Sequence, residues 1–176
     1  MQYGVFFRAI NVGKHNRVRM EDLRALATSL GYTDVATYLQ TGNMALGTAE
    51  SAESVTERLE ATLPSVGVKD VAVIVRSRDE LHALGSAGDP FARFPSEDHR
   101  HMAIFTRERV AAAEPAPYVV KGVTVVAVDR AAVLATIPRA PARPLNPNAV
   151  VESHWHTRAT TRWWNVVEEF RRDLLA

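Results

Sequence analysis

The stretch Tyr3-Gly4-Val5-Phe6-Phe7-Arg8-Ala9-Ile10-Asn11-Val12-Gly13-Lys14 reads as an apolar strand that breaks into an Asn-Val-Gly turn. Arg8 is embedded in its apolar run, and a charge taken into a protein core is costly unless it is paired. We therefore expect Arg8 either to face solvent or to have a specific role. The elements that follow this strand decide the fold class.

A helix is expected directly after the polar loop that ends this stretch. Four apolar residues recur there at the spacing of one helix face: Met20, Leu23, Ala27 and Leu30. Glu21 and Asp22 suit the positive end of a helix dipole, and Gly31 suits a helix end. The pattern predicts a helix from about Arg19 to Leu30.

The remainder of the first half alternates strands and a helix. We expect strands at 34–40, 43–46 and 71–76 and a helix at 53–63, with a tight turn at Thr41-Gly42 between the first two strands. The order over residues 3–76 is the βαββαβ pattern of a ferredoxin-like sandwich, in which two helices cover one face of an antiparallel sheet. None of the expected helices covers the other face of that sheet, so this face is available for contact with another segment or molecule.

The second half gives a weaker version of the same pattern. A short helix at 79–84 and a Gly/Pro-punctuated junction at 85–95 come first. We then expect a strand at 102–105, a short alanine-rich helix at 107–114, a β-rich stretch at 119–128 turning at Lys121-Gly122, and a helix at 130–137. The proline-rich run Pro138–Pro147 predicts an extended connection.

An amphipathic helix is expected at the end of the chain, from an N-cap at Thr160 or Thr161, with Trp163 on its core-facing side. The prediction is an α+β protein of two ferredoxin-like (α/β plait) subdomains with antiparallel sheets and helices on one face. The first is the βαββαβ subdomain at 1–88, and the second, less regular one is at 89–176.

Composition narrows the class of protein. With 47% hydrophobic and 23% charged residues the chain can support a packed core. It has no cysteine, which excludes disulfides, thiolate catalysis and cysteine-ligated metal centres. The net charge of +1 does not favour nucleic acid as a partner, although a local basic patch is compatible with it. No apolar run suits a membrane span and no leader pattern precedes the first strand, so we expect a cytoplasmic protein.

Three stretches together resemble a bacterial family known as a domain of unknown function, number 1697 in that series. They are Phe6–Gly13, Thr37–Asn43 and Thr160–Val167. The family motifs read L-R-G-I-N-V-G-G, T-Y-[IL]-Q-S-G-N and T-x-R-N-W-N-T-V. The resemblance implies a cytosolic protein of two α/β-plait subdomains and supplies no reaction.

This chain departs from the family pattern at three places. Ala9 stands where the family usually has Gly, and Trp163 where it usually has Asn. The family's basic stretch G-x-G-R-S-K-L is absent, and the run Pro138–Pro147 stands near its place. Any role of that loop in the family is therefore not expected here.

The polar residues of the motifs, with Lys14 and Trp164, form the predicted ligand-binding set: Arg8, Asn11, Lys14, Gln40, Asn43, Arg162, Trp164 and Asn165. Amide and guanidinium groups do not abstract protons at neutral pH, so the set suits recognition of an anion, a nucleotide or a nucleic-acid strand. The alternative is that the asparagines are turn residues and the arginines make structural ion pairs. Lys14 also belongs to a basic loop that extends to Arg19.

Two H-x-H pairs raise the possibility of a metal site. His99 and His101 alternate at strand spacing, as do His154 and His156, and imidazole nitrogens bind zinc, nickel or copper. The alternative is that these histidines are solvated or stacked on other rings. We predict no cofactor.

Three classes of function follow from these observations. The leading one is a non-catalytic binding protein for an anionic small molecule, a nucleotide or a single-stranded nucleic acid. The second is an enzyme, a hydrolase or transferase that uses histidines and a bound metal; the chain has no G-x-S-x-G turn to support a serine nucleophile. The third is an oligomerisation or interaction module that uses an open sheet face or edge.

Overall fold

The first strand runs over Gln2–Phe7 (β1) in the computed structural model, which describes every residue from Met1 to Ala176. It ends one residue before Arg8, so the prediction that the arginine is embedded in the strand is wrong. The physical reason lies in the backbone, because Ala9 and Asn11 have φ angles of 62° and 53°. These left-handed conformations cannot continue a strand.

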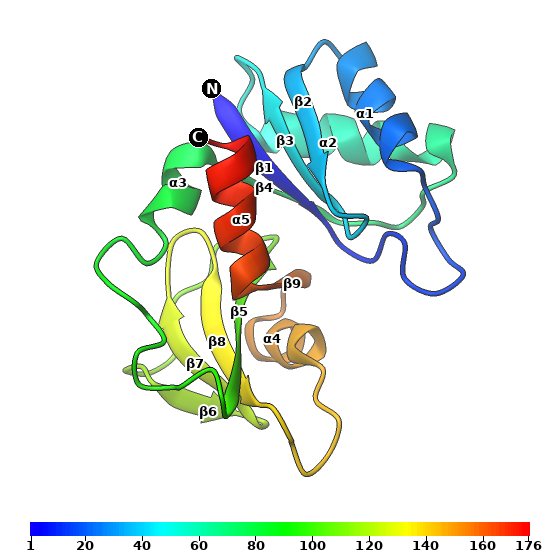
Figure 1. The fold of residues 1–176 in the computed structure, drawn as a ribbon. Coiled ribbons are helices and arrows are strands. Elements are labelled where there is room, and N and C mark those ends of the chain that lie inside the picture. The colour runs from blue at the N-terminus through cyan, green and yellow to red at the C-terminus, as the bar shows by residue number, and fades with distance from the viewer. The chain divides into compact units, whose positions relative to one another are not determined.

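The chain divides into two compact units, Met1–Leu81 with Phe170–Ala176, and His82–Glu169. The elements of the first unit after β1 are α1 (Met20–Ser29), β2 (Thr33–Tyr38), β3 (Asn43–Gly47), α2 (Ala52–Thr62), the short 3₁₀ helix η1 (Leu63–Val66), β4 (Val73–Ser77) and α3 (Arg78–Ala83), whose last two residues fall in the second unit. The strands lie in the order β2-β3-β1-β4, and every neighbouring pair is antiparallel. Figure 1 shows this order, which is that of the predicted ferredoxin-like sandwich.

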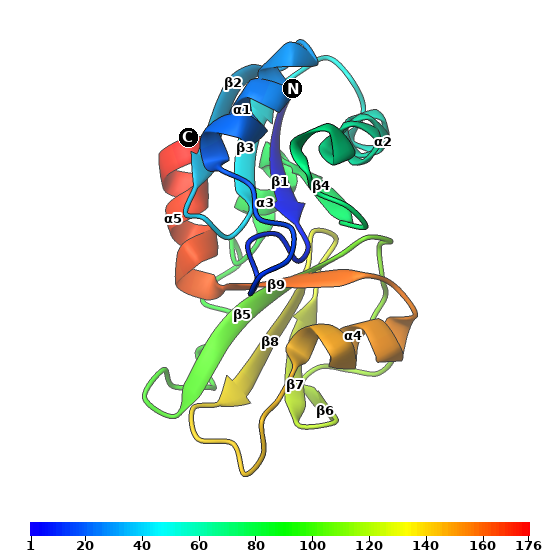
Figure 2. The same cartoon turned by 90° about the vertical axis from the view of Figure 1, so that its right-hand side faces the viewer.

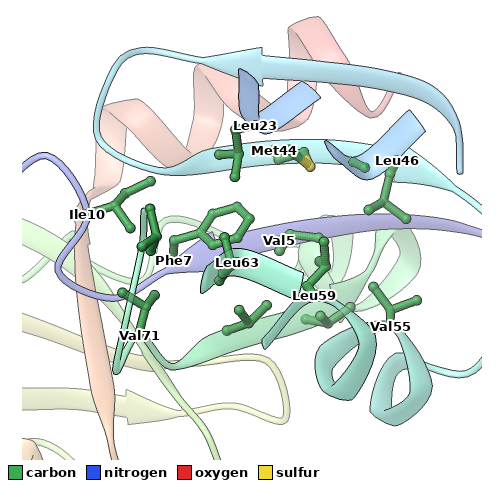
Figure 3. Packing of buried hydrophobic residues seen from close by; sticks show 14 of the residues in the cluster. Val5, Phe7, Ile10, Leu23, Met44, Leu46, Val55, Leu59, Leu63 and Val71 are labelled. Carbon is green, nitrogen blue, oxygen red and sulfur yellow. The ribbon is translucent and has the colours of Figure 1, made fainter. Parts of the chain in front are cut away.

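The core of the first unit lies between one sheet face and helices α1 and α2. Val5 and Phe7 of β1 point into it together with Leu23 of α1 and Leu59 of α2, and all four are fully buried. Figure 3 shows these side chains meeting with Met44 of β3. Because burying such a side chain stabilises a fold by about 1.5–3 kcal/mol, the apolar spacing in the sequence determines which helix faces meet the sheet.

The other face of this sheet carries the end of the chain. The ring of Phe170 lies 5.6 Å from the ring of Phe6 and 6.5 Å from that of Tyr38, measured between centroids. A Cβ atom at Gly4 would stand 3.0 Å from Phe170 and 2.5 Å from Leu81, so glycine makes room for both. The sequence left this face open, and within the first unit the C-terminal residues cover part of it.

The second unit holds β5 (His99–Thr106), β6 (Tyr118–Val120), β7 (Val123–Val128), β8 (Val133–Pro138), α4 (Pro147–Trp155) and β9 (Ala159–Trp163). Helix α5 (Trp164–Leu174) begins in this unit, and its residues from Phe170 onward belong to the first. The strand order is β6-β7-β8-β5-β9, with antiparallel neighbours throughout. Strands β7-β8-β5-β9 repeat the topology β2-β3-β1-β4, which confirms the predicted fold class. Figure 2 shows α4 on one face of this sheet, where Val151 joins the core.

Two of the helices predicted in the second half are wrong. Residues 107–114 form no helix and their side chains are largely exposed, so burial provides no apolar face to stabilise one. Residues 133–138 form β8 instead of a helix, paired with β5 on one side and β7 on the other. A central strand is buried on both faces, and the run of β8, which is apolar except for Thr136, is easily confused with a buried helix.

The C-terminal prediction is partly wrong. Thr160 and Thr161 lie within β9 and do not cap a helix, and the helix begins at Trp164. Helix α4 was not predicted, although Pro147 occupies its first position and the Asn146 side chain caps it by accepting from the Ala149 amide at 3.2 Å. None of the helices is both long enough and apolar enough to cross a membrane.

Candidate functional site

Two of the sequence motifs, Phe6–Gly13 and Thr37–Asn43, contact each other at one end of the first sheet. The Phe7 amide donates to the Gly42 carbonyl at 2.9 Å, and the Asn11 side chain donates to the Gln40 carbonyl at 3.0 Å. Gly42 has a φ of 81°, and a Cβ atom there would stand 2.8 Å from Ile10. The two motifs therefore occur together for a structural reason: the Ile10 side chain needs a glycine opposite it.

The amides of Asn11 and Asn43 hold these turns. Besides its bond to Gln40, Asn11 accepts from the Val18 amide at 2.9 Å and donates to the Val18 carbonyl at 3.1 Å. Asn43 is buried and donates to the Tyr38 carbonyl at 2.9 Å and to the Thr41 hydroxyl at 3.1 Å. These bonds support the structural alternative for both residues, and ligand binding by them stays a prediction.

Arg8 and Arg162 belong to different units, so their convergence stays a prediction. Arg8 is half-buried just past β1, where its amide donates to the Ala72 carbonyl at 2.9 Å. Arg162 is buried and donates to the Thr160 hydroxyl at 2.8 Å and to the Thr161 carbonyl at 2.9 Å. Burial lowers the pKa of Arg162 to about 10, which still leaves its guanidinium charged at neutral pH.

Lys14 and Gln40 are exposed on the loops of the first unit. The Lys14 turn is tied at its base, because the Arg17 side chain donates to the Gly13 carbonyl at 3.1 Å. Arg19 at the end of this basic loop forms ion pairs with Glu21 and Asp22. Pairing with Arg19 lowers the pKa of Asp22, first through their side-chain hydrogen bond, so Arg19 adds little free positive charge to the loop.

The second unit contains a pocket of about 480 Å³ that we call the Trp163 pocket. It lies where β5 begins, β8 has just ended and β9 passes into α5. Its lining residues are Ser96, His99, Arg100, His101, Arg139, Trp163, Trp164, Asn165 and Glu168. Pockets of roughly 300–1,000 Å³ are typical of sites for small molecules.

Aromatic side chains form one wall of this pocket. Trp163 is 41% exposed, so the prediction that it packs in the core is wrong, because it ends a strand and does not lie inside a helix. Trp164 meets Phe91 edge to face, with ring centroids 5.4 Å apart. Phe91 in turn stacks on His101 at 4.4 Å with the two rings nearly parallel. These contacts hold the Trp164 side of the wall in place.

The charged groups of the pocket favour an anion. The guanidinium of Arg100 lies 5.7 Å from the centre of the Trp163 ring, and the Arg139 side chain donates to the Ser96 carbonyl at 2.5 Å. Neither arginine takes part in an ion pair. The pocket also contains the first residues of α5, and the start of a helix presents free N–H groups and partial positive charge. Glu168 is the single carboxylate of the lining.

The predicted histidine pairs do not form a metal centre. His99 and His101 line the Trp163 pocket on β5, whereas His154 lies on α4 and His156 ends that helix. No group of three or more side chains of the metal-binding types is gathered anywhere in the chain. His101 lies 2.5 Å from the Phe94 carbonyl through Nε2, and Nδ1 of His99 is buried without a hydrogen-bond partner.

Four residues of the predicted sets meet in this pocket: His99, His101, Trp164 and Asn165. Sequence reasoning missed Arg100, Arg139 and Glu168 as members of the site. Arg139 lies in the run Pro138–Pro147, for which we predicted an extended connection and no functional residue. The alternation His99-Arg100-His101 gave no signal for Arg100, since successive residues of a strand point to opposite faces, whereas the pocket at the start of β5 is lined by all three.

A larger pocket of about 810 Å³ lies in the first unit, at the end of the sheet where β1 begins. Its lining includes the carboxylates Asp34, Glu50 and Asp79 and the hydroxyls of Thr33, Thr48 and Ser77, and it has no aromatic side chain. Arg78 in this pocket lies 3.9 Å from Asp79. The carboxylates disfavour an anion there, and the Trp163 pocket is the better candidate for one.

The comparisons with known proteins agree with the fold. The chain is similar to a solved structure, the conserved bacterial protein SP0830 from Streptococcus pneumoniae, with 19% identity, a TM-score of 0.64 and coverage of 98% of each chain. At this identity the likeness shows the fold alone. No curated protein matches the chain. The family described as "Protein of unknown function (DUF1697)" matches residues 1–133, which is more than half of the sequence and includes two of the three motifs. The chain therefore belongs to the DUF1697 family.

Proposed function

We propose that this protein binds a small anionic ligand with a planar ring, of the nucleotide class, in the Trp163 pocket. The observation that carries the proposal is the juxtaposition of Arg100 and Arg139, which have no carboxylate partner, with the partly exposed side chain of Trp163 and the start of α5. A phosphate suits the two arginines and the start of α5, which we call the anion half of the pocket. A planar ring suits Trp163, which we call the ring half.

The anion half of the pocket combines two sources of positive charge. A guanidinium binds a phosphate through paired N–H donors in a fixed geometry. A helix N-terminus adds about 0.3–1 kcal/mol for a negative group at an exposed site. Arg100 and Arg139 give two full charges against the one carboxylate of Glu168. A monoanion or dianion is therefore favoured over a cation.

The ring half of the pocket is provided by the tryptophans. Stacking of a nucleobase on an aromatic side chain contributes about 1–3 kcal/mol. Trp163 is 41% exposed, so part of its side chain is available to a ring, and the guanidinium of Arg100 lies 5.7 Å from the centre of the same indole ring. A ligand that places its phosphate near Arg139 and its ring near Trp163 would use both halves.

The rival function at the same pocket is an enzyme that uses His99 or Glu168 on the bound ligand. The observation that favours it is the buried Nδ1 atom of His99, which has no hydrogen-bond partner. Phosphorus NMR of the protein with adenosine 5′-monophosphate distinguishes the two functions. Binding alone leaves the nucleotide signal in place, whereas a hydrolase produces inorganic phosphate.

Isothermal titration calorimetry with adenosine and guanosine 5′-monophosphates tests the proposal. We expect micromolar to sub-millimolar binding by the wild type and a loss of at least tenfold in Arg139→Ala. Arg143→Ala is the matched control, because it removes the same charge from an exposed position outside the pocket, and we expect less than a twofold change. Absence of binding at millimolar nucleotide, or equal losses in the two variants, would refute the proposal.

A further inference from the structure

We infer that Asn165 reads the edge of the ligand's ring, so the ligand carries a nucleobase with a neighbouring hydrogen-bond donor and acceptor, best matched by adenine. This inference rests on the proposed function of the Trp163 pocket and goes further, because that function requires only an anion and a planar ring.

The inference begins from a difference among the three asparagines of the sequence motifs. Asn11 and Asn43 use their amides to hold turns of the first unit. The side chain of Asn165 makes no hydrogen bond to any other group of the protein, and it lines the Trp163 pocket. Its donor and acceptor are therefore both available to a bound molecule.

The position of Asn165 suits a recognition role. It is the second residue of α5, directly after Trp164, so its backbone is fixed by the helix while its amide lies at the pocket. Asparagine is a poor helix former compared with leucine, and it does not cap α5 from this position. Helix stability alone gives no reason for an asparagine at this site.

The hydrogen-bonding groups of the Asn165 carboxamide favour one kind of base in the ligand. A carboxamide offers one acceptor and two donors, and it pairs with adenine through the N6 amino group and N7. A benzene ring has no such edge. Guanine presents two acceptors on its N7 side, which suit an arginine better than an asparagine. Arg100 and Arg139 serve the anion in the proposed function, and Asn165 is the one carboxamide of the lining, the group whose donor and acceptor match the adenine edge.

The test compares two nucleotides that differ at the ring edge alone, together with an aromatic phosphate that has no base and no ribose. We use adenosine 5′-monophosphate, purine riboside 5′-monophosphate, which lacks the N6 amino group, and phenyl phosphate, each titrated into the wild type and into Asn165→Leu. Leucine is the better helix former, so the variant should fold, and an unchanged circular dichroism spectrum confirms this.

We expect the wild type to bind the adenine nucleotide at least tenfold more tightly than either other ligand, and this preference to fall below threefold in Asn165→Leu. Equal binding of the three ligands, or a preference that survives in Asn165→Leu, overturns the inference while leaving the proposed function intact. Binding of none of the three overturns both.

Discussion

Gly42→Ala tests the contact between the two motifs of the first unit. Gly42 has a φ of 81°, and a Cβ atom there would stand 2.8 and 2.9 Å from two carbons of Ile10 and 3.1 Å from Phe7. Both neighbours are 1% exposed, so they cannot move into solvent. The alanine must therefore distort the packing that joins the two motifs.

The expected loss of unfolding free energy in Gly42→Ala has two parts, and a matched control variant separates them. Placing alanine in a left-handed conformation costs about 1–2 kcal/mol, offset by about 0.4–1 kcal/mol from the lower entropy of the unfolded chain. Overpacking adds about 1–3 kcal/mol. Gly67 also has a φ of 81° but has nothing within 4 Å of its Cβ position, so Gly67→Ala measures the first part alone.

Urea unfolding followed by circular dichroism measures both variants. We expect Gly42→Ala to lose about 2–4 kcal/mol of unfolding free energy and Gly67→Ala about 1 kcal/mol. If Gly42→Ala costs no more than Gly67→Ala, the contact between Ile10 and Gly42 does not hold the motifs together, and the structural explanation for their co-occurrence is wrong.

Three further predictions concern stability and use the same urea assay. Ala9→Gly should stabilise the protein by about 0.5–1 kcal/mol, because Ala9 has a φ of 62°, whereas Ala61→Gly in α2 should cost about 1 kcal/mol; a loss at Ala9 would contradict the left-handed turn. Phe170→Ala should cost about 3–5 kcal/mol, because its ring packs on Phe6 and Tyr38. Asp173→Ala, an exposed position on the same helix, should change stability by less than about 0.5 kcal/mol, and similar losses would mean that Phe170 does not cover the sheet. Asn146→Ala should cost about 1 kcal/mol through loss of the α4 cap, and an unchanged midpoint would argue against that cap.

Local patterns in the sequence were enough to predict the first unit. The helix expected at 19–30 is α1 (Met20–Ser29), and that expected at 53–63 is α2 (Ala52–Thr62). Each has a clear apolar stripe, and the short connections between elements leave few alternative topologies. The turn at Gly42 and the family motifs agree with this arrangement.

The second unit was harder to predict because long-range contacts decide its elements. Strand β8 is buried on both faces and is apolar except for Thr136, so it has no clear periodicity, and only its pairing with β5 and β7 makes it a strand. The apolar spacing at the C-terminus continued from Trp163 into the helix, but pairing with β5 draws Ala159–Trp163 into β9. Helix propensity is too weak to override a strand partner.

The candidate site was predicted only in part for a related reason. Trp164 and Asn165 belong to a recognisable motif, whereas Arg100 and Arg139 reach the pocket because β5 begins beside the end of β8. His99 pairs with Pro138 in that register, which places the residue after Pro138 at the pocket. No sequence pattern reports this adjacency.

The most direct test of the central claim is to titrate ¹⁵N-labelled protein with adenosine 5′-monophosphate and follow the indole N–H signals. The chain has three tryptophans, and Trp155 is an internal control because its indole donates to the Ala111 carbonyl on α4's side of the sheet and it does not line the pocket. We predict saturable shifts of the Trp163 and Trp164 signals, abolished by Arg139→Ala, with Trp155 unmoved. Shifts confined to Trp155, or no shift of any indole at millimolar nucleotide, would contradict the assignment of the Trp163 pocket as the binding site.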